Sequence, residues 1–213
     1  TLKQYAHLLG SPVIAHSIDA VSRHPAVGAV TVALAPDDGI FDELVRPHYA
    51  AVRTVTGGDS RARSVMNGLA AILDHDPACE WGLVHDAARP CLRAATLGRL
   101  VDAGLRSDQG AILAVPVHDT LKRADDAGRI ESTVDRSRYW AAQTPQMFRI
   151  RELAVHLAAA LAAGESPTDE AAAMERAGAH PLLVMGDRSN IKITGPEDLA
   201  LAQFILQQQS LED

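Results

Sequence analysis

Aromatic residues are scarce in this chain. Phe, Trp and Tyr make up 4% of its 213 residues, although 47% of the residues are hydrophobic. The core is therefore expected to consist of small aliphatic contacts rather than stacked rings. Cysteine is also rare, and the two cysteines, Cys79 and Cys91, show neither a CxxC spacing nor a Cys/His metal-binding spacing. Free thiols in a reducing compartment are the simpler interpretation.

Positive charge is in deficit, because 20 Lys and Arg residues stand against 27 Asp and Glu residues, for a net charge of −7. This balance argues against general affinity for nucleic acid. A local cluster of Lys and Arg can still bind a small phosphorylated ligand in one cleft. The chain has no apolar run near the ~20 residues of a membrane span, and no basic-then-apolar leader at its start. We expect a soluble, cytoplasmic protein.

Two kinds of segment alternate along the chain. Short aliphatic runs predict buried strands, and the stretches with helical period between them predict covering helices. The predicted strands lie at Ala29–Ala35, Trp81–His85, Gly110–Val115 and Pro181–Met185. This alternation predicts an α/β fold with a mostly parallel sheet and helices on both faces. The length suits a single domain over residues 1–213, with ligands bound beyond the carboxyl ends of the strands.

Two helix starts carry clear signals. Thr194 can cap a final helix, with Pro196 in the first turn and Glu197 completing a capping box. Thr168 is expected to open another helix, with acidic residues in its first turn and Gly178 past its end.

The segment from Asp119 to Asp135 breaks the alternation. It reads as two strand-like pieces around Asp126-Ala127-Gly128, a plausible hairpin turn, and neither piece has enough apolar residues to cover a core. An isolated hairpin is marginal in water. We therefore expect a β-arm at about residues 117–140 that packs against a second subunit.

Three segments contain residues suited to phosphate chemistry. Asp86, at the end of a predicted strand, could place a metal or ribose ligand beside the phosphate-binding guanidinium of Arg89; the alternative is a surface salt bridge. Gly57-Gly58 at a helix entrance lets backbone amides approach a ligand, although a tight turn with a cap explains the same pattern. Lys192 in a predicted short strand, Asn190–Thr194, is either solvated or an inward phosphate ligand. No histidine has a metal-binding spacing, and Lys3 alone carries no signal.

Together these segments resemble the family of 2-C-methyl-D-erythritol 4-phosphate cytidylyltransferases of the non-mevalonate isoprenoid pathway. The matching stretches, in family order, are LKQYAHLLGSPVIAHSIDA, GGDSRARSV, VHDAARP, VPVHDTLKRA, TVDRSRYWAAQTPQ, SPTDEA and NIKITGPEDLALA. The resemblance implies a nucleotide-binding variant of the Rossmann fold like that of nucleotide-diphospho-sugar transferases. It also implies Mg²⁺-CTP as the donor and a homodimer that exchanges β-arms.

The resemblance also implies three groups of site residues. Those that act on the reacting phosphates are Lys3, Arg136 and Lys192. Those that bind the nucleotide are Gly58, Asp59, Ser64, Asp86 and Ala87, with Asp86 also the metal ligand. Those that bind methylerythritol phosphate are Arg89, Thr120, Arg136, Thr144, Thr168 and Lys192, and of these Thr120 and Arg136 would come from the other subunit.

Two features depart from the family pattern. The family places a strand and a glycine- and arginine-rich phosphate loop before its lysine motif, whereas this chain starts at Thr1, next to that motif, and Leu2 stands where the family usually has proline. Two other functions stay open. One is transfer to ribitol 5-phosphate, by a sister family with similar motifs, and the other is a non-catalytic nucleotide-binding module.

Overall fold

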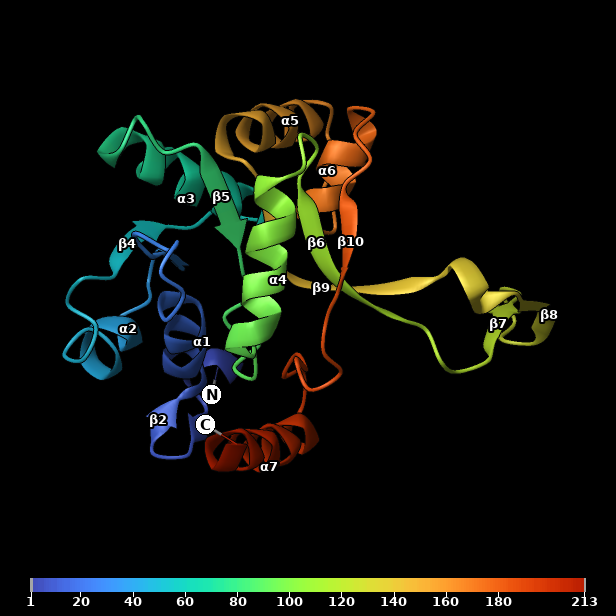
Figure 1. Cartoon of the computed structure of the whole chain (residues 1–213), viewed down its shortest axis with the longest axis horizontal. Coiled ribbons are helices and arrows are strands. Elements are labelled where there is room, and N and C mark those ends of the chain that lie inside the picture. The colour runs from blue at the N-terminus through green and yellow to red at the C-terminus, as the bar shows by residue number, and fades with distance from the viewer. Residues whose placement is uncertain (1, 213) are drawn as a thin grey trace.

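A computed structural model describes residues 2–212, and shows an α/β body from which a long hairpin projects (Figure 1). The strands are β1 (His7–Leu8), β2 (Ser11–Pro12), β3 (Thr31–Leu34), β4 (Arg53–Thr56), β5 (Trp81–Val84), β6 (Ala111–Pro116), β7 (Leu121–Ala124), β8 (Ile130–Val134), β9 (Trp140–Arg149) and β10 (Leu182–Met185). The helices are the 3-10 turns η1 (Lys3–Tyr5) and η2 (Arg136–Arg138), and α1 (Val13–Ser22), α2 (Ile40–Leu44), α3 (Arg61–His75), α4 (Ala94–Leu105), α5 (Ile150–Ala162), α6 (Glu170–Arg176) and α7 (Pro196–Glu212).

The central sheet is mixed rather than mostly parallel. Its order is β10-β6-β9-β5, with β10 parallel to β6 and β9 antiparallel to both of its neighbours. The expected α/β class is confirmed, but the expected mostly parallel sheet is not, because β9 runs antiparallel to both of its neighbours. The cause is β9, which enters the sheet after a hairpin, whereas a parallel strand would need a crossover connection.

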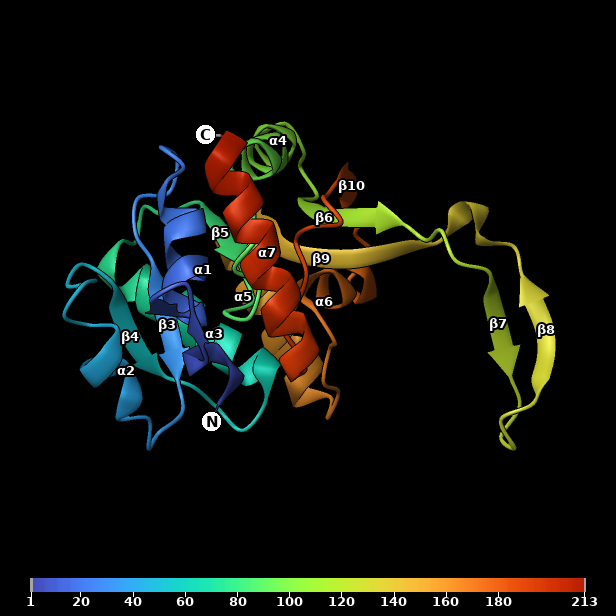
Figure 2. The same ribbon diagram turned by 90° about the horizontal axis from the view of Figure 1, so that it is seen from below.

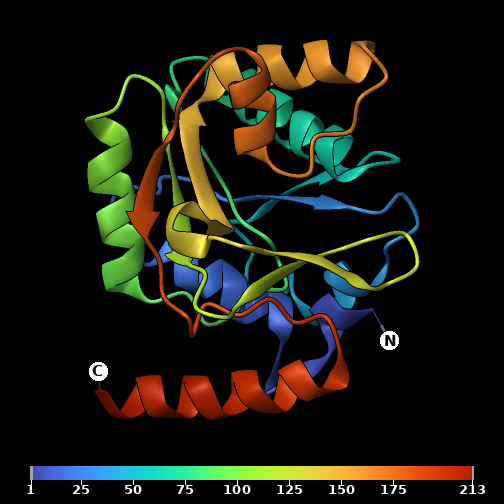
Figure 3. The same ribbon diagram turned by 90° about the vertical axis from the view of Figure 1, so that its right-hand side faces the viewer.

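Alternate residues of the central strands face opposite helical layers. Leu113 and Met147 pack with Leu97 and Leu100 of α4, whereas the neighbouring residues of the same strands pack against α3, α5 and α6. Figure 3 shows the green α4 on one side of these strands and the orange α5 and α6 on the other. This period of two is typical of a sheet covered on both faces.

Strands β3 and β4 form a separate parallel pair. An apolar cavity of about 770 Å³ lies between this pair and β5, lined mainly by side chains of α1, β3, α3 and β5. The carboxyl ends of β3 and β5 therefore approach one region of the body, although no strand pairing among the described residues joins them.

The hairpin of β7 and β8 is antiparallel and stands clear of the body in Figure 2. Its turn is held by Asp125, whose carboxylate accepts hydrogen bonds from the backbone N–H groups of Ala127 and Arg129 at 3.0 and 2.9 Å. Gly128 adopts the positive φ of +75° that the turn needs. The predicted turn at residues 126–128 is confirmed.

Two helix caps differ from the expected ones. At α7, Asp198 rather than Glu197 accepts from the backbone of Thr194 and Gly195, at 2.7 and 3.0 Å. At α6 the cap is Asp169, which accepts from Ala172 at 2.9 Å, so the helix opens one residue later than predicted. In both cases an aspartate, which is short enough to reach the free N–H groups, takes the capping role.

The segment 190–194 is not part of any described strand. The N–H of Ile193 donates to Ala88 O in a loop at 2.8 Å, and the side-chain amide of Asn190 donates to Thr144 O of β9 at 2.8 Å. The prediction of a strand around Lys192 was wrong. Within residues 2–212 no helix is both long and apolar enough to cross a membrane.

Candidate active site

Asp86, the second residue after β5, lies at the centre of a cluster of cations. Its carboxylate is 14% exposed and contacts Lys192 Nζ at 2.8 Å, Arg61 at 3.3 Å and Arg89 at 3.7 Å. Burial alone raises the pKa of Asp86, but Lys192, Arg61 and Arg89 together hold this pKa below its usual range. Asp86 is therefore an anion, and the two oxygens of its carboxylate face different partners.

Arg61 is the first residue of α3, and it joins Asp86 to a second, fully buried carboxylate. Glu170 is 0% exposed, and its two oxygens accept from Arg61 at 2.6 and 3.0 Å. Burial raises the pKa of Glu170, and the hydrogen bond and charge of Arg61 oppose that rise. Such a two-point pairing fixes the plane of the guanidinium.

Thr144 and His85 fix the backbone at Asp86. Thr144 lies opposite Asp86, two residues beyond the paired residues Val84 and Gln146, and its Oγ1 accepts from the Asp86 N–H at 3.0 Å. The His85 Nε2 lies 3.0 Å from the carbonyl oxygen of Arg89, which can only accept, so Nε2 carries the hydrogen. The other ring nitrogen then accepts from the Thr144 hydroxyl, also at 3.0 Å. Burial lowers the pKa of His85 to about 4, so the ring is neutral at neutral pH.

The Gly57-Gly58 turn fits closely against the start of α3. A side chain at Gly58 would come within 2.0 Å of Arg63, and the Gly58 N–H donates to Ser64 Oγ at 3.0 Å. Ser60 caps the helix, accepting from Arg63 at 3.2 Å. The predicted helix cap in this motif is confirmed, and Asp59 is exposed beside it.

Lys3 and Lys192, near opposite ends of the chain, line the same cavity. Its volume is about 230 Å³, and its wall also includes Asp86 and Ala87. The turn that carries Lys3 is fixed by Tyr5, whose hydroxyl donates to Asp38 at 2.7 Å. Three cationic side chains, those of Arg61, Arg89 and Lys192, thus contact Asp86, and Lys3 lines the same cavity.

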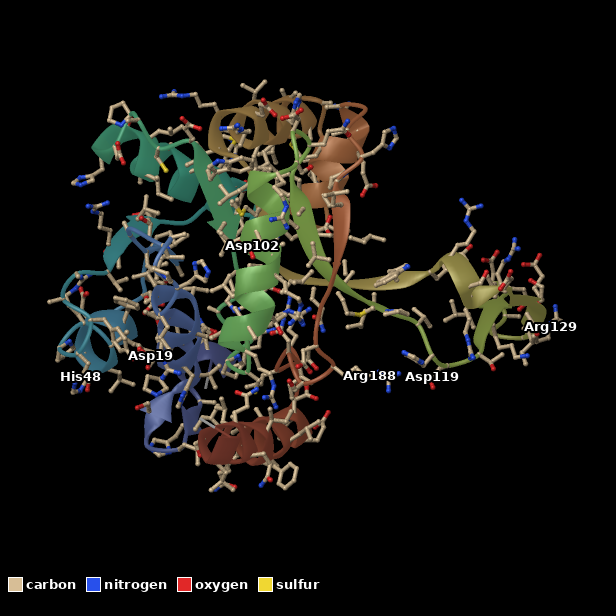
Figure 4. All side chains as sticks on the ribbon, in the orientation of Figure 1. Asp19, His48, Asp102, Asp119, Arg129 and Arg188 are labelled. Atoms are coloured by element: carbon tan, nitrogen blue, oxygen red, sulfur yellow. The ribbon has the colours of Figure 1, made fainter. Side chains whose placement is uncertain are left out.

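The remaining predicted residues lie apart from this cavity. Thr168 is exposed just before α6, and Thr120 and Arg136 are exposed on the projecting segment. Figure 4 labels Asp119, the neighbour of Thr120, out along this segment, away from the body. Within one chain, therefore, the structure brings together Lys3, Asp86, Ala87, Arg89, Thr144 and Lys192, with Gly58 and Ser64 at the helix beside them.

Sequence reasoning did not assign a role to Arg61 or Glu170. Arg61 follows a predicted glycine turn and Glu170 lies in a predicted helix, but 109 residues separate them, and local patterns carry no sign of the pairing. No group of three or more His, Cys, Asp or Glu side chains suited to a metal occurs in the described part of the chain. Asp38 and Asp86 both line the cavity, and Asp86, which contacts Lys192, is the carboxylate better placed to bind a divalent cation accompanying a phosphate ligand.

The α/β fold is that of the nucleotidyltransferase class. A solved 4-diphosphocytidyl-2C-methyl-D-erythritol synthase superposes with a TM-score of 0.87, at 42% identity, over 96% of this chain and 94% of that one. The synthase from Anaerococcus prevotii gives a TM-score of 0.85 at 29% identity, over 96% and 93% of the two chains.

Sequence comparison identifies the family within that class. The family model for IspD, 2-C-methyl-D-erythritol 4-phosphate cytidylyltransferase, matches residues 1–208. The enzyme of that name from Tolumonas auensis is 48% identical over 99% of this chain and 90% of its own length, and the one from Shewanella oneidensis is 48% identical over 96% and 80%. The chain belongs to the 2-C-methyl-D-erythritol 4-phosphate cytidylyltransferase family, which confirms the resemblance found in its motifs.

Proposed function

We propose that this chain transfers CMP from CTP to 2-C-methyl-D-erythritol 4-phosphate and releases pyrophosphate. The observation that carries the proposal is the cavity shared by Lys3, Lys192 and Asp86 at the end of β5. Cations placed on two sides of one cavity suit a reaction in which two polyanions must meet and further negative charge develops.

The reaction needs positioning and charge neutralisation rather than a covalent intermediate. A phosphate oxygen of the acceptor attacks the α-phosphorus of CTP, the bond from that phosphorus to the bridging oxygen breaks, and pyrophosphate leaves with the electron pair. Lys3 would contact the α-phosphate, and Lys192 would move from Asp86 to the reacting phosphates. Nothing in the site requires a proton to be removed from the attacking phosphate oxygen, which is already anionic.

Mg²⁺ enters this proposal as part of the Mg²⁺-CTP substrate. One carboxylate together with substrate phosphates is a common way for a protein to bind Mg²⁺. Asp86 fits that role, because Lys192, which now occupies one of its oxygens at 2.8 Å, is 39% exposed and has room to turn toward a phosphate.

The remaining site residues take the roles that the family resemblance implies. Gly58, Asp59 and Ser64 would bind the cytosine, and Ala87 the ribose. Arg89 and Thr168 would contact methylerythritol phosphate. The Thr144 hydroxyl already donates to His85 and accepts from Asp86. It keeps one lone pair, to which a polyol hydroxyl can donate.

Thr120 and Arg136 would serve the active site of a second subunit. The hairpin that precedes Arg136 has no core of its own, and Ile130 on it is 70% exposed. A two-stranded hairpin with an exposed isoleucine is expected to gain stability by packing against another surface. A homodimer that exchanges these arms provides that surface and completes each site.

Pyrophosphate release by the full-length protein tests the function. CTP and Mg²⁺ are supplied with either 2-C-methyl-D-erythritol 4-phosphate or ribitol 5-phosphate, and kcat/KM is compared. We expect the first acceptor to be preferred by about 10²-fold or more, since a site that hydrogen-bonds particular hydroxyls rejects a wrong polyol strongly. A preference for ribitol 5-phosphate would assign the sister activity. CTP binding with no turnover of either acceptor would indicate a non-catalytic module.

A further inference from the structure

Glu170 is the most completely buried charged residue in the ion pairs near the proposed site, and it does not line the cavity of Lys3 and Lys192. Its carboxylate is 0% exposed, and both oxygens bond to Arg61, at 2.6 and 3.0 Å. A buried carboxylate is costly unless it is paired and fully hydrogen-bonded. An ion pair of this kind is therefore a candidate for a role beyond stability.

The position of Glu170 is itself fixed by the central sheet. Gln146 of β9 is 1% exposed and holds the start of α6 at two points. Its side-chain oxygen accepts from the Ala171 N–H at 2.9 Å, and its amide donates to Asp169 at 2.9 Å. Glu170, between these two residues, has little freedom to shift, so it provides a rigid anchor.

Arg61 links Glu170 to Asp86 through its guanidinium. The guanidinium uses Nη1 and Nη2 for Glu170, and Nη2 and Nε lie 3.3 and 3.4 Å from Oδ1 of Asp86. The other Asp86 oxygen, Oδ2, faces Lys192 at 2.8 Å and Arg89 at 3.7 Å. Oδ1 of Asp86 is thus held by Arg61, which Glu170 fixes in place. Oδ2 faces Lys192 and Arg89, the groups that would contact the substrates.

Glu170 also determines which of the cations that contact Asp86 is free to bind phosphate. Around Asp86 three cations, Arg61, Arg89 and Lys192, face two carboxylates, those of Asp86 and Glu170, which leaves one net positive charge. Without Glu170 the same cluster would carry two, and Arg61 would be free to turn toward a phosphate. The bidentate pair prevents this and keeps Arg61 directed at Asp86.

We propose that Glu170 is a positioning residue that acts through Arg61, fixing the Asp86 carboxylate so that its Oδ2 faces Lys192 and the phosphates of Mg²⁺-CTP. This inference rests on the proposed function, because Asp86 matters here as the group that receives the nucleotide. In this proposal Arg61 holds Asp86 in position and does not itself contact a substrate.

The test compares kcat and KM of the wild type with those of Glu170→Gln, Arg61→Ala and the double variant. Glu170→Gln keeps the shape but removes the charge that orients Arg61. Residues that orient a ligand-binding group typically contribute 10–100-fold to activity. We expect kcat to fall by about that factor in Glu170→Gln, and the double variant to be no slower than Arg61→Ala. The control is Glu165→Gln, which breaks the exposed ion pair with Arg176 beside the same helix and should leave kcat unchanged.

Rescue by free guanidinium separates positioning from folding. Millimolar guanidinium should restore turnover to Arg61→Ala, because it can bind between Glu170 and Asp86, but should not restore it to the double variant. Failure to rescue Arg61→Ala while the variant keeps a native unfolding midpoint would overturn the proposal. The proposal would also be overturned if Glu170→Gln were as active as Glu165→Gln. It would be overturned as well if the fold-losses in kcat of Glu170→Gln and Arg61→Ala multiplied in the double variant. A wild type that releases no pyrophosphate from CTP refutes the proposed function instead.

Discussion

Lys192 makes the shortest contact with Asp86, at 2.8 Å, yet its side chain is 39% exposed. An exposed ion pair contributes little to stability. The value of this lysine should therefore appear in catalysis, where its charge would meet the charge that develops on the phosphates during transfer.

We predict that Lys192→Ala lowers turnover by about 10²–10³-fold and changes the urea midpoint little. Steady-state pyrophosphate release and equilibrium unfolding measure the two effects. Arg176→Ala removes an exposed cation from the ion pair with Glu165 and serves as the control. Near-normal turnover in Lys192→Ala would mean that the lysine is only a solvated surface group.

The neutral ring of His85 makes a specific pH dependence of stability testable. The pKa of this ring is lowered to about 4 in the folded protein, against about 6.5 in an unfolded chain. Between these values the unfolded state binds a proton that the folded state does not, so the free energy of unfolding falls as pH decreases from 6.5 to 4. Above pH 6.5 the contribution is fully present.

We therefore predict that between pH 7 and pH 5 the wild type loses about 1–2 kcal/mol more unfolding free energy than His85→Asn does. Urea unfolding at several pH values, without divalent cations, gives the comparison. The same pH slope in both proteins would show that His85 is protonated in the folded state as easily as in the unfolded chain.

At the scale of single residues, the sequence predicted the parts of the site that local pattern can reveal. Asp86 follows an aliphatic strand and Lys192 precedes a capped helix, so both could be located from their neighbours. Glu170 and Arg61 could not, because their pairing exists only once the first residues of α3 and α6 meet in the folded chain. The resemblance assigned roles to residues, but the neutral His85 bonded to Thr144 is visible only in three dimensions.

At the scale of elements, Gly110 before β6 shows how one residue limits the packing of a strand. Its φ is +80°, and a side chain there would come within 2.2 Å of the Phe148 ring and 2.7 Å of the Met147 backbone oxygen. Gly128 in the hairpin turn has a similar φ of +75°, but a methyl group at that position would have no other atom within 4 Å. An alanine at either position would be strained by the positive φ, but only at Gly110 would its methyl group also clash with neighbouring atoms.

We predict that Gly110→Ala lowers the free energy of unfolding by about 2–5 kcal/mol, since overpacking adds to the cost of a left-handed alanine. Gly128→Ala should cost about 1 kcal/mol. Urea unfolding of both variants measures the difference. Equal losses would indicate that β6 and β9 shift to accept the extra methyl group.

The elements themselves followed the hydrophobic pattern. The bounds of β5, β6 and β10 agree with the predicted aliphatic runs to within one residue, and β3 starts two residues later than predicted. The segment 190–194 did not form a strand, although three of its five residues are β-branched. Its Asn190 side chain bonds to Thr144 of β9, and its Ile193 N–H bonds to Ala88 in a loop. Propensity alone could not show that no strand edge was available to this segment.

At the scale of the whole molecule, the direction of β9 was beyond the reach of the local pattern. The sequence of Trp140–Arg149 contains no signal that would tell in which direction the strand runs in the sheet. Its direction depends on the hairpin of β7 and β8, which carries the chain away from the body and back again (Figure 2). The same hairpin therefore explains the antiparallel direction of β9 and places Arg136 away from the α/β body of its own chain.

The projecting hairpin leads to the last prediction, which concerns sharing of the active site between subunits. Arg136 lies in η2, where Asp135 accepts from the Ser137 N–H at 3.0 Å and holds the turn at the end of β8. The arm-exchange proposal places this arginine in the site of the other subunit. Arg136→Ala and Lys192→Ala should then each be nearly inactive, because each removes one cation from every site of its own homodimer.

Mixed and allowed to exchange subunits, the two variants should complement each other. In a two-fold dimer each site consists of one body and one borrowed arm, so a hybrid has one site with both substitutions and one with neither. Random pairing makes about half of the dimers hybrids, and roughly a quarter of wild-type activity should return. Exchange is followed by native mass spectrometry or by pull-down of a tag on one variant. If Arg136 served its own subunit, every site would carry one substitution, and confirmed exchange would restore no activity.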